Sequence, residues 1–356
     1  MMKGIFIYCR AGFEGECAAE IQERAGTLGI YGYSKAKPAS GYMVFTPSDP
    51  DDADRLHREL PFDELIFVRQ WFVVLIMRND LPQDDRISAL LDALSQMPEV
   101  ANSLQIDTPD TNEAKQLSGL CRSVTKPAQA ILAKHGLYQK SEAGEGVRCH
   151  ICFMSVQAAY AGYSLVNNSS PWPMGIPRLR SSSKAPSRST LKLDEAFLIF
   201  LDASQRHDYL QAGMTAVDLG ACPGGWTWQL VRRGLKVVAI DNGAMAESVM
   251  ETGLVTHMRV DGYQFQPDEP VDWMVCDIVE SPIRTAELAA RWLSQRWCKH
   301  TVFNLKLPMK KRWQELTRCL DLIRLTLDSA GVSYQLRVRQ LYHDREEVTV
   351  YLLVIN

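Results

Sequence analysis

The segment Ala216–Thr227, with the sequence AVDLGACPGGWT, constrains the fold of this chain more than any other. An apolar run leads into Asp218, a glycine-rich turn covers residues 220–225, and an amphipathic pattern continues over Trp226–Arg233. This succession predicts a strand, a tight loop and the first turns of a helix. Glycines let the loop backbone lie directly against a ligand because they carry no Cβ atom, and the free N–H groups of the helix start face the same space.

The loop differs from two common nucleotide-binding loops. Gly220, Gly224 and Gly225 do not follow the GxGxxG spacing of dinucleotide-binding folds, and the Gly-Lys-Ser/Thr of a P-loop is missing. Cys222 and Pro223 lie between the glycines instead. The pattern therefore argues against a nicotinamide-dependent dehydrogenase.

Three successive predicted strands each end near an aspartate: Asp218, Asp241 and Asp261. A carboxylate at Asp218 would repel a pyrophosphate but suits a cationic sulfonium and its amino-acid tail. Asp241 lies where an acid grips two ribose hydroxyls, and Asp261 could meet an adenine amino group. All three could instead be helix N-caps, where aspartate is common. Together with the glycine loop, including Trp226 at the helix start, the set favours S-adenosyl-L-methionine (SAM) as the ligand.

From Ser187 onward, predicted helices and strands alternate, which is typical of a doubly wound, mostly parallel α/β sheet. Ligands of such sheets bind at the carboxyl ends of the strands. The last two strands, Ser333–Gln340 and Glu347–Ile355, lie close together in the sequence and predict an antiparallel hairpin at one edge. A single helix is expected over Leu191–Gln211. Further strands are expected to start at Thr215, Lys236, Val255, Asp272 and Thr301, and helices near Trp226, Ala244, Ile283 and Lys310.

The front of the chain predicts two α+β units without a catalytic constellation. Residues 1–80 have the element order of a ferredoxin-like unit, and residues 81–166 form the second unit. Cys149 and Cys152 form one CxxC, but a metal site needs a second ligand pair at matching spacing, so core packing is the better interpretation. Helices are expected over Glu14–Thr27, Asp52–Glu59, Gln83–Ser95, Asn112–Val124 and Lys126–His135, and strands over Gly4–Arg10, Gly41–Thr46, Leu65–Met77, Ser103–Asp107, Val147–Ser155 and Tyr160–Val166.

Residues 167–186 change character and are rich in proline and serine, which predicts an extended connector. Arg178, Arg180, Lys184 and the adjoining Arg188 follow Trp172. Cations interleaved with a stacking aromatic residue are typical of a surface for single-stranded nucleic acid. A solvated linker without a partner is the alternative interpretation.

Whole-chain properties narrow the class of protein further. The net charge of −3 argues mildly against a protein that coats nucleic acid nonspecifically. Nine scattered cysteines, an odd number, indicate reduced thiols and a cytoplasmic location. The longest apolar run is too short to span a bilayer, so no membrane association is expected. Nothing in the sequence indicates an obligatory protein partner.

Four polar residues fall where the second sheet would present them: Lys192, Asp277, Lys306 and Glu347. If the last strand is antiparallel, all four could converge above the bound sulfonium. Two lysines and two carboxylates make chemical sense for methylating a hydroxyl. A ribose 2′-hydroxyl, for example, is a weak nucleophile that must lose its proton as it attacks. A lysine with its usual pKa of about 10.4 is a poor base at neutral pH. We expect burial and the ammonium of Lys192 to lower the pKa of Lys306, the predicted base, while the two carboxylates orient the pair.

The segments DLGACPGGWT, VCD, NLKLP and REEVTVYLL resemble the FtsJ-related 2′-O-ribose methyltransferases, which have a Rossmann-like sheet and a Lys-Asp-Lys-Glu tetrad. Motif by motif, the resemblance places the tetrad on Lys192, Asp277, Lys306 and Glu347. It also implies that SAM is the cofactor, with S-adenosyl-L-homocysteine as the product and no metal. The implied SAM pocket would be lined by Ser189, the loop Cys222–Gly225, Asp241, Asp261 and Asp277.

A longer set of segments, beginning with SPWPMGIPRL, is similar to the bacterial RlmM family, whose members methylate the 2′-oxygen of one cytidine, cytidine 2498, of large-subunit rRNA. This resemblance covers the whole chain. It implies a ferredoxin-like domain (1–80), an RNA-binding THUMP domain (81–166), a basic linker (167–186) and a methyltransferase domain (187–356), with large-subunit rRNA as the partner.

Two further functions stay open at this point. Methylation of cytosine at C5 needs a cysteine nucleophile, and Cys276 beside Asp277 is the one tempting candidate. It should alternate away from Asp277 into the packing of the sheet, and no Pro-Cys motif accompanies it. A non-catalytic RNA-binding assembly factor could keep the same motifs, although the intact tetrad argues against one.

Overall fold

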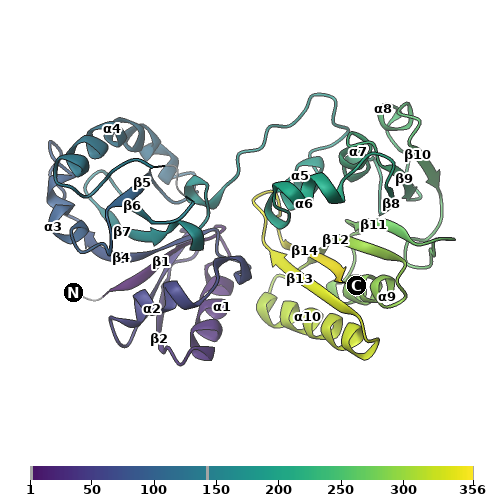
Figure 1. Cartoon of the computed structure of the whole chain (residues 1–356), viewed down its shortest axis with the longest axis horizontal. Helices are drawn as coiled ribbons and strands as arrows, with labels where there is room; N and C mark the ends of the chain where they lie inside the picture. The colour runs from purple at the N-terminus through teal and green to yellow at the C-terminus, as the bar shows by residue number, and fades with distance from the viewer. Residues whose placement is uncertain (1–2, 142–143, 356) are drawn as a thin grey trace. The chain divides into compact units, whose positions relative to one another are not determined.

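The structure is a computed structural model that describes residues 3–141 and 144–355. The chain divides into two compact units, Met1–Pro177 and Arg178–Asn356. Within the described residues, each unit contains one seven-stranded sheet with helices packed against it (Figure 1). The predicted fold class, a mostly parallel α/β sheet preceded by α+β elements, is confirmed.

The sheet of the first unit joins both predicted front segments, because β4 pairs antiparallel with β7. The strand order is β2-β3-β1-β4-β7-β6-β5. One strand, β2, was not predicted, because its sequence GYSKA lacks apolar alternation and it lies at an edge of the sheet. The strands are β1 Gly4–Tyr8, β2 Gly32–Ala36, β3 Tyr42–Pro47, β4 Gln70–Arg78, β5 Ala101–Asp107, β6 Val147–Phe153 and β7 Ala159–Leu165.

The helices of the first unit correct two predictions. The helix expected over Gln83–Ser95 is shorter and consists of a 3-10 turn over Ser88–Leu90 followed by the four-residue helix Leu91–Leu94. The Asp85 carboxylate accepts the Ser88 N–H at 3.1 Å, and the helical segment starts there. The break expected near Lys126 is absent, and one helix continues through Pro127. The helices are α1 Glu14–Thr27, α2 Asp52–Glu59, α3 Leu91–Leu94 and α4 Ser118–Lys134, with 3-10 turns η1 Phe62–Glu64, η2 Ser88–Leu90, η3 Ala114–Leu117, η4 Val166–Asn168 and η5 Pro173–Gly175.

The sheet of the second unit has the order β10-β9-β8-β11-β12-β14-β13. Strands β8 to β12 are parallel, and β14 is antiparallel to both of its neighbours, as the sequence predicts. The carboxyl ends of five strands therefore meet the start of β14 at one edge. The strands are β8 Thr215–Leu219, β9 Lys236–Ile240, β10 Val255–Met258, β11 Val271–Cys276, β12 Cys298–Lys306, β13 Ser333–Arg339 and β14 Glu347–Ile355.

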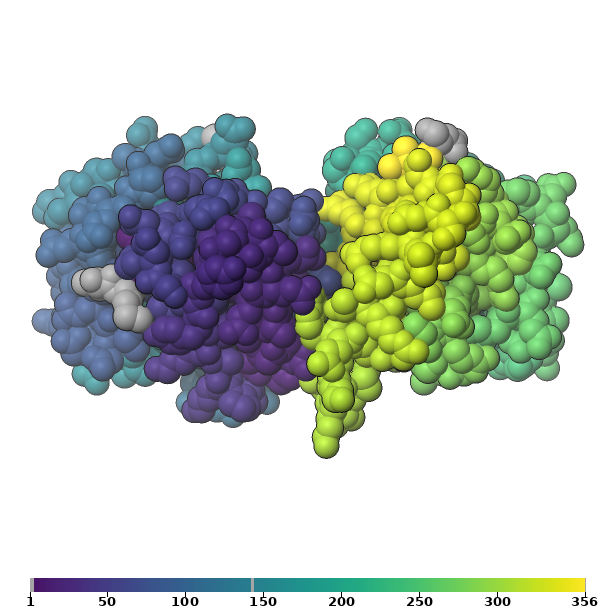
Figure 2. Space-filling model, turned by 90° about the horizontal axis from the view of Figure 1, so that it is seen from below, coloured from purple at the N-terminus to yellow at the C-terminus, as the bar shows by residue number. Residues whose placement is uncertain are grey.

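Helices cover both faces of this sheet, with α5, α6 and α7 on one face and α9 and α10 on the other (Figure 1). Figure 2 shows the side that carries α10, where yellow-green and yellow residues from the end of the chain form the surface. Leu193 and Phe197 of α5 pack against Trp273 in the core beneath α5 and α7. The helices are α5 Thr190–Phe200, α6 Ala203–Tyr209, α7 Gly225–Val231, α8 Glu247–Met250, α9 Pro282–Ser294 and α10 Arg312–Ser329.

The single helix predicted over Leu191–Gln211 is two helices, α5 and α6. The Asp202 carboxylate accepts the Gln205 N–H at 2.8 Å, and the Gln205 side chain accepts the Asp202 N–H at 3.0 Å. This capping box starts a new helix and explains the break. None of the helices in the described part of the chain is long and apolar enough to cross a membrane.

Candidate functional site

Two pairs of polar residues face each other across the ladder of β12 and β14. Lys306 is directly opposite Glu347, and Asn304 is directly opposite Thr349. Residues two positions apart on a strand project from the same face. All four side chains therefore project from one face of the sheet, the face that carries α5.

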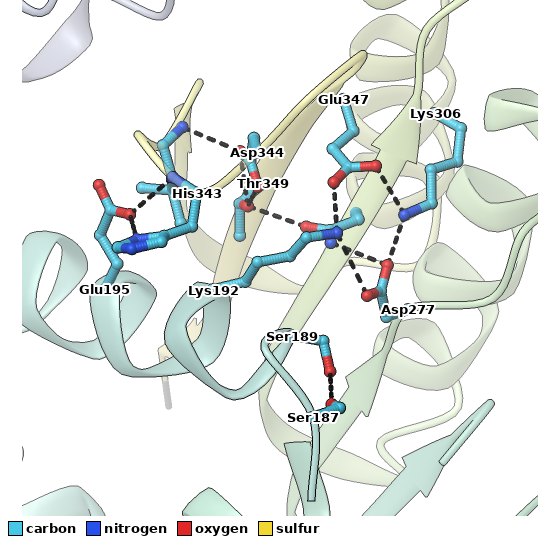
Figure 3. A network of polar contacts seen from close by, with 12 residues as sticks. Ser187, Ser189, Lys192, Glu195, Asp277, Lys306, His343, Asp344, Glu347 and Thr349 are labelled. Carbon is cyan, nitrogen blue, oxygen red and sulfur yellow. Dashed lines mark hydrogen bonds and ion pairs between the residues drawn. The ribbon is translucent and has the colours of Figure 1, made fainter. Parts of the chain in front are cut away.

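Lys192 and Asp277 complete this cluster from α5 and from the end of β11 (Figure 3). The Lys306 Nζ lies 2.5 Å from Asp277 Oδ1 and 2.8 Å from Glu347 Oε2. The Lys192 Nζ lies 3.4 Å from Asp277 Oδ2 and forms an ion pair with Glu347 Oε1. The four side chains are only 8% to 20% exposed. The structure thus brings the four predicted residues together, each ammonium touching both carboxylates.

The ion pairs correct the predicted pKa of Lys306. Burial acts to lower the pKa of this ammonium, but the carboxylates of Asp277 and Glu347 outweigh burial and raise the pKa above its ordinary value. The expectation that Lys192 and burial would lower it is wrong, because the ion pairs with Asp277 and Glu347 outweigh burial. Burial likewise acts to raise the pKa of Glu347, but the two ammonium groups lower it.

The glycine loop is shaped by close packing. Gly224 has a φ of 110°, a conformation that side chains rarely adopt, and a Cβ atom there would lie 3.1 Å from Val249 Cγ2. A Cβ atom at Gly225 would overlap the hydroxyls of Ser187 and Ser189, which lie 2.6 Å apart. Ser189, at the start of α5, therefore lies directly against the loop. Gly220 is also constrained, since it has a φ of 78° and an added Cβ atom would lie 2.7 Å from Ile278 Cγ1.

Asp241 and Asp261 follow the two strands beyond β8. The Asp241 carboxylate accepts the Cys222 N–H at 2.9 Å and the Gly243 N–H at 2.7 Å. The Asp241 carboxylate therefore connects the glycine loop to the end of β9. Pro223 is the residue after Cys222 in this loop. Asp261 is exposed after β10, and its carboxylate accepts the Tyr263 N–H at 2.8 Å.

Two residues predicted to bind the cofactor have buried side chains. The Asp218 carboxylate is 1% exposed and accepts the Thr227 hydroxyl at 2.6 Å. Burial raises the pKa of Asp218 to about 7, although the hydrogen bond from Thr227 opposes the rise. The Trp226 side chain packs in the core with Leu193 and Leu230. Asp218 and Trp226 thus support the loop from below.

Sequence reasoning missed three buried polar residues beside the tetrad: Asn304, Thr349 and Asp344. The Asn304 Nδ2 donates to Asp277 Oδ1 at 2.9 Å, and the Thr349 Oγ1 lies 2.8 Å from Asn304 Oδ1. Thr349 also lies 3.0 Å from Asp344 Oδ2 (Figure 3). A period of two from Lys306 and Glu347 along their strands would have indicated Asn304 and Thr349. Nothing comparable in the sequence indicated Asp344, which lies in a loop.

Glu195, one helical turn after Lys192, holds the loop that leads to Glu347. Its buried carboxylate accepts the N–H groups of Tyr342 at 2.8 Å and His343 at 3.0 Å. The His343 Nδ1 lies 2.6 Å from the same carboxylate (Figure 3). Helix α5 therefore fixes both Lys192 and the entry of β14.

The thiols of Cys276, Cys149 and Cys152 are buried and make no part of the tetrad. Cys276 is fully buried, and burial raises the pKa of its thiol to about 12. Burial raises the pKa of Cys149 to about 12 as well, and Cys152 is also buried. Among the residues that the structure describes, no group of three or more His, Cys, Asp or Glu side chains could hold a metal ion.

The four cations predicted to meet RNA are all exposed: Arg178, Arg180, Lys184 and Arg188. Trp172 is half-buried and belongs to the first unit, which ends at Pro177. The cations therefore lie at the start of the second unit, before α5 begins.

Three family models match this chain in succession. Residues 2–72 match the RlmM ferredoxin-like domain, and residues 85–165 match the model described as ribosomal RNA large subunit methyltransferase M, N-terminal. Residues 185–318 match the FtsJ-like methyltransferase model.

Curated relatives cover nearly the whole chain. A protein from Shigella sonnei named ribosomal RNA large subunit methyltransferase M is 49% identical over 99% of this chain and 96% of its own length. A protein of the same name from Shewanella amazonensis is 50% identical over 99% of this chain and 98% of its own length. Among solved structures, TrmN from Thermus thermophilus matches 99% of this chain and 100% of its own, with 15% identity and a TM-score of 0.35.

Proposed function

The chain belongs to the ribosomal RNA large subunit methyltransferase M family, and from this premise we propose that it is a SAM-dependent methyltransferase of large-subunit rRNA acting on the ribose 2′-oxygen of one cytidine. The observation that carries the 2′-oxygen assignment is the convergence of Lys306, Lys192, Asp277 and Glu347 in one part-buried cluster. A hydroxyl nucleophile needs a positioned proton acceptor, and we propose Lys306 of this cluster for that role.

We propose that the Cys222–Gly225 loop and the carboxylates after β9 and β10 form a cradle for the cofactor. Ser189 lies directly against this loop, and Asp241 and Asp261 follow neighbouring parallel strands. When bound there, SAM supplies a methyl group on a sulfonium and leaves as S-adenosyl-L-homocysteine. Asp241 would hold the ribose hydroxyls, Asp261 the adenine end, and Ser189 and the Cys222–Gly225 loop the remaining wall.

Lys306 is the proposed general base. As the 2′-oxygen bonds to the methyl carbon, its proton passes to the neutral Nζ of Lys306. Because Asp277 and Glu347 raise the pKa of this lysine, it is an effective proton acceptor once it is neutral, and it must first release its own proton. A further positive charge close to Asp277 would weaken the attraction between Asp277 and Lys306 and would lower the pKa of Lys306. Asp277 and Glu347 orient both ammonium groups throughout.

We further propose that the substrate is gripped outside the reacting cluster. The exposed cations Arg178, Arg180, Lys184 and Arg188 at the start of the second unit suit an RNA backbone. The first unit, in which no catalytic cluster was predicted, is proposed to bind RNA, with residues 81–166 acting as a THUMP domain.

Cytosine C5 methylation is the weaker alternative. Its nucleophile must be a thiolate, and Cys276 is buried with a pKa of about 12. A non-catalytic assembly factor would not require two ammonium groups that each pair with both Asp277 and Glu347.

The test is mass-spectrometric mapping of methylated nucleotides in rRNA from cells that lack this chain. We expect one 2′-O-methylcytidine to disappear and to return with the wild-type chain but not with K306A. Loss of a base methyl group instead would favour the cysteine mechanism. Full restoration by K306A would remove Lys306 from the reaction.

A further inference from the structure

The hydroxyl of Thr349 has one proton, but oxygen atoms of two neighbouring side chains lie within hydrogen-bond distance of it. Its Oγ1 lies 2.8 Å from Asn304 Oδ1, 3.1 Å from Asp344 Oδ1 and 3.0 Å from Asp344 Oδ2. A hydroxyl donates once and accepts twice. One of these two neighbours must therefore donate to Thr349, or two sets of lone pairs face each other in a buried site.

Asn304 cannot be the donor to Thr349, because its amide is already oriented by Asp277. The Asp277 Oδ1, which also receives the Lys306 ammonium, lies 2.9 Å from the Asn304 side chain. Turning the amide over would place its carbonyl oxygen against an ionised carboxylate. The amide nitrogen must therefore face Asp277 and the carbonyl oxygen must face Thr349, so that Thr349 donates to Asn304.

The remaining contact needs a proton from Asp344. We infer that Asp344 is protonated in the folded protein and donates to Thr349, forming a directed chain of hydrogen bonds Asp344–Thr349–Asn304–Asp277 that positions the Asp277 carboxylate between the two lysines. Asp344 Oδ2 accepts the Leu341 N–H at 2.8 Å, so the proton belongs on Oδ1, which lies 3.1 Å from Thr349 Oγ1. Every polar atom that the chain joins is then used with the correct polarity.

The surroundings of Asp344 favour the neutral form. Asn304 and Thr349 are 0% exposed and Asp344 is 1% exposed, so water does not stabilise a charge there. Two carboxylates face it, Glu347 from β14 and Glu195 from α5, while Lys192 on α5 is the cation nearby. Burial, followed by the charge of Glu347, raises the pKa of Asp344 well above its ordinary value.

The inference deepens the proposed function and rests on it for its effect on rate. A protonated Asp344 adds no negative charge to a cluster in which two ammonium groups already match two carboxylates. It also leaves Asn304 with one allowed orientation, with its N–H toward Asp277. Asp344, Thr349 and Asn304 are therefore positioning residues, which act on the reaction through Asp277.

The first test compares D344N with D344A. Asparagine can donate an N–H to Thr349 and accept the Leu341 N–H, as a protonated aspartate does, whereas alanine can do neither. We expect D344A to lose about tenfold to a hundredfold in methyl-transfer rate, the usual cost of breaking one buried hydrogen bond, and D344N to recover most of it. If D344N is as impaired as D344A while both remain folded by thermal unfolding, Asp344 is charged and the inference is overturned.

The second test does not depend on methyl transfer. The infrared difference spectrum between the wild-type chain and D344N should contain the C=O stretch of a protonated carboxyl at neutral pH. That band should shift in T349V, which removes the hydroxyl, and stay in place in T349S, which keeps it. A difference spectrum with only ionised-carboxylate bands would overturn the inference even if the chain is an active methyltransferase. A carboxyl band in a chain inactive on rRNA would support the inference and count against the proposed function alone.

Discussion

Lys306 and Glu347 lie directly opposite each other on antiparallel strands, with the ammonium nitrogen 2.8 Å from a carboxylate oxygen. The pairing depends on β14 starting where β12 ends, so the reversed direction of β14 brings a residue from the start of one strand to the end of another. Because Asp277 and Lys192 reach the same point, a shift of β14 by one residue would turn Glu347 to the other face.

Replacing Lys306 by alanine should lower the rate of methyl transfer by roughly 10²–10⁴-fold, the usual contribution of a positioned base. The affinity for SAM should stay similar, because Lys306 makes no part of the proposed cradle. Steady-state kinetics and calorimetry measure the two quantities. K299A removes an exposed lysine at the other end of β12 and serves as the matched control. An unchanged turnover for K306A would exclude Lys306 as the base.

Replacing Gly224 by valine should abolish SAM binding. The φ of 110° is unfavourable for valine, and its side chain would meet Val249 and Met245 beside the loop. G213V carries the same kind of backbone strain, with a φ of 93°, but has open space around the added Cβ atom. Calorimetry with SAM should therefore separate the two variants. Equal affinities would contradict the assignment of this loop to the cofactor.

Asp218 predicts a pH dependence of stability. Its pKa is about 7 in the folded chain and about 3.9 when unfolded, so between these values the folded state retains a proton that the unfolded state has lost. The free energy of unfolding should therefore fall as pH rises through this window, by up to about 1.4 kcal/mol per pH unit from this group. Denaturant unfolding across the window should show a shallower fall for D218N, which cannot titrate. The exposed D208N is the control, and identical slopes for D218N and wild type would refute the prediction.

Reversing Arg178, Arg180 and Lys184 to glutamate should weaken binding to RNA and flatten its dependence on salt. Each lost phosphate contact to a single strand lowers the slope of log K against log salt by about 0.7. A matched reversal of three exposed cations elsewhere in the second unit, Lys236, Arg318 and Arg324, controls for net charge. Binding titrations at several salt concentrations distinguish the two triple variants. If the first behaves as wild type, the connector is only a spacer.

Replacing Cys276 by alanine should leave most of the methyl-transfer activity in place. The side chain is fully buried in β11 and the pKa of its thiol is about 12, so it contributes packing and no nucleophile. Truncating a buried side chain lowers stability, so activity is measured below the unfolding temperature of the variant. Complete loss of activity in a folded C276A would revive cytosine C5 methylation as the reaction.

Sequence patterns predicted the second unit better than the first. The alternation of apolar runs and helical segments identified β8 to β12, and the apolar run after Glu347 identified β14. The capping box at Asp202 is equally visible in the sequence, but the apolar pattern on either side hid the break between α5 and α6. Strand β2 escaped because an exposed edge strand needs no apolar face.

The site was predictable as a set of residues and less so in its electrostatics. Motif spacing indicated Lys192, Asp277, Lys306 and Glu347. The direction in which the pKa of Lys306 shifts depends on the distances from its Nζ to Asp277 (2.5 Å) and Glu347 (2.8 Å), which the spacing of residues in the sequence does not give. Asp344 escaped for the same reason, because its partner Thr349 is defined by the way a loop folds back onto β14.

The continuous sheet of the first unit has a consequence for how its two halves can be separated. The hydrogen bonds between β4 and β7 join the two halves, and a register shift between Val74 and Ile76 shows that β4 accommodates one extra residue opposite β7. Separating the two halves would therefore leave an unpaired strand edge on each, at β4 and at β7. Each half covers an edge that the other would otherwise expose.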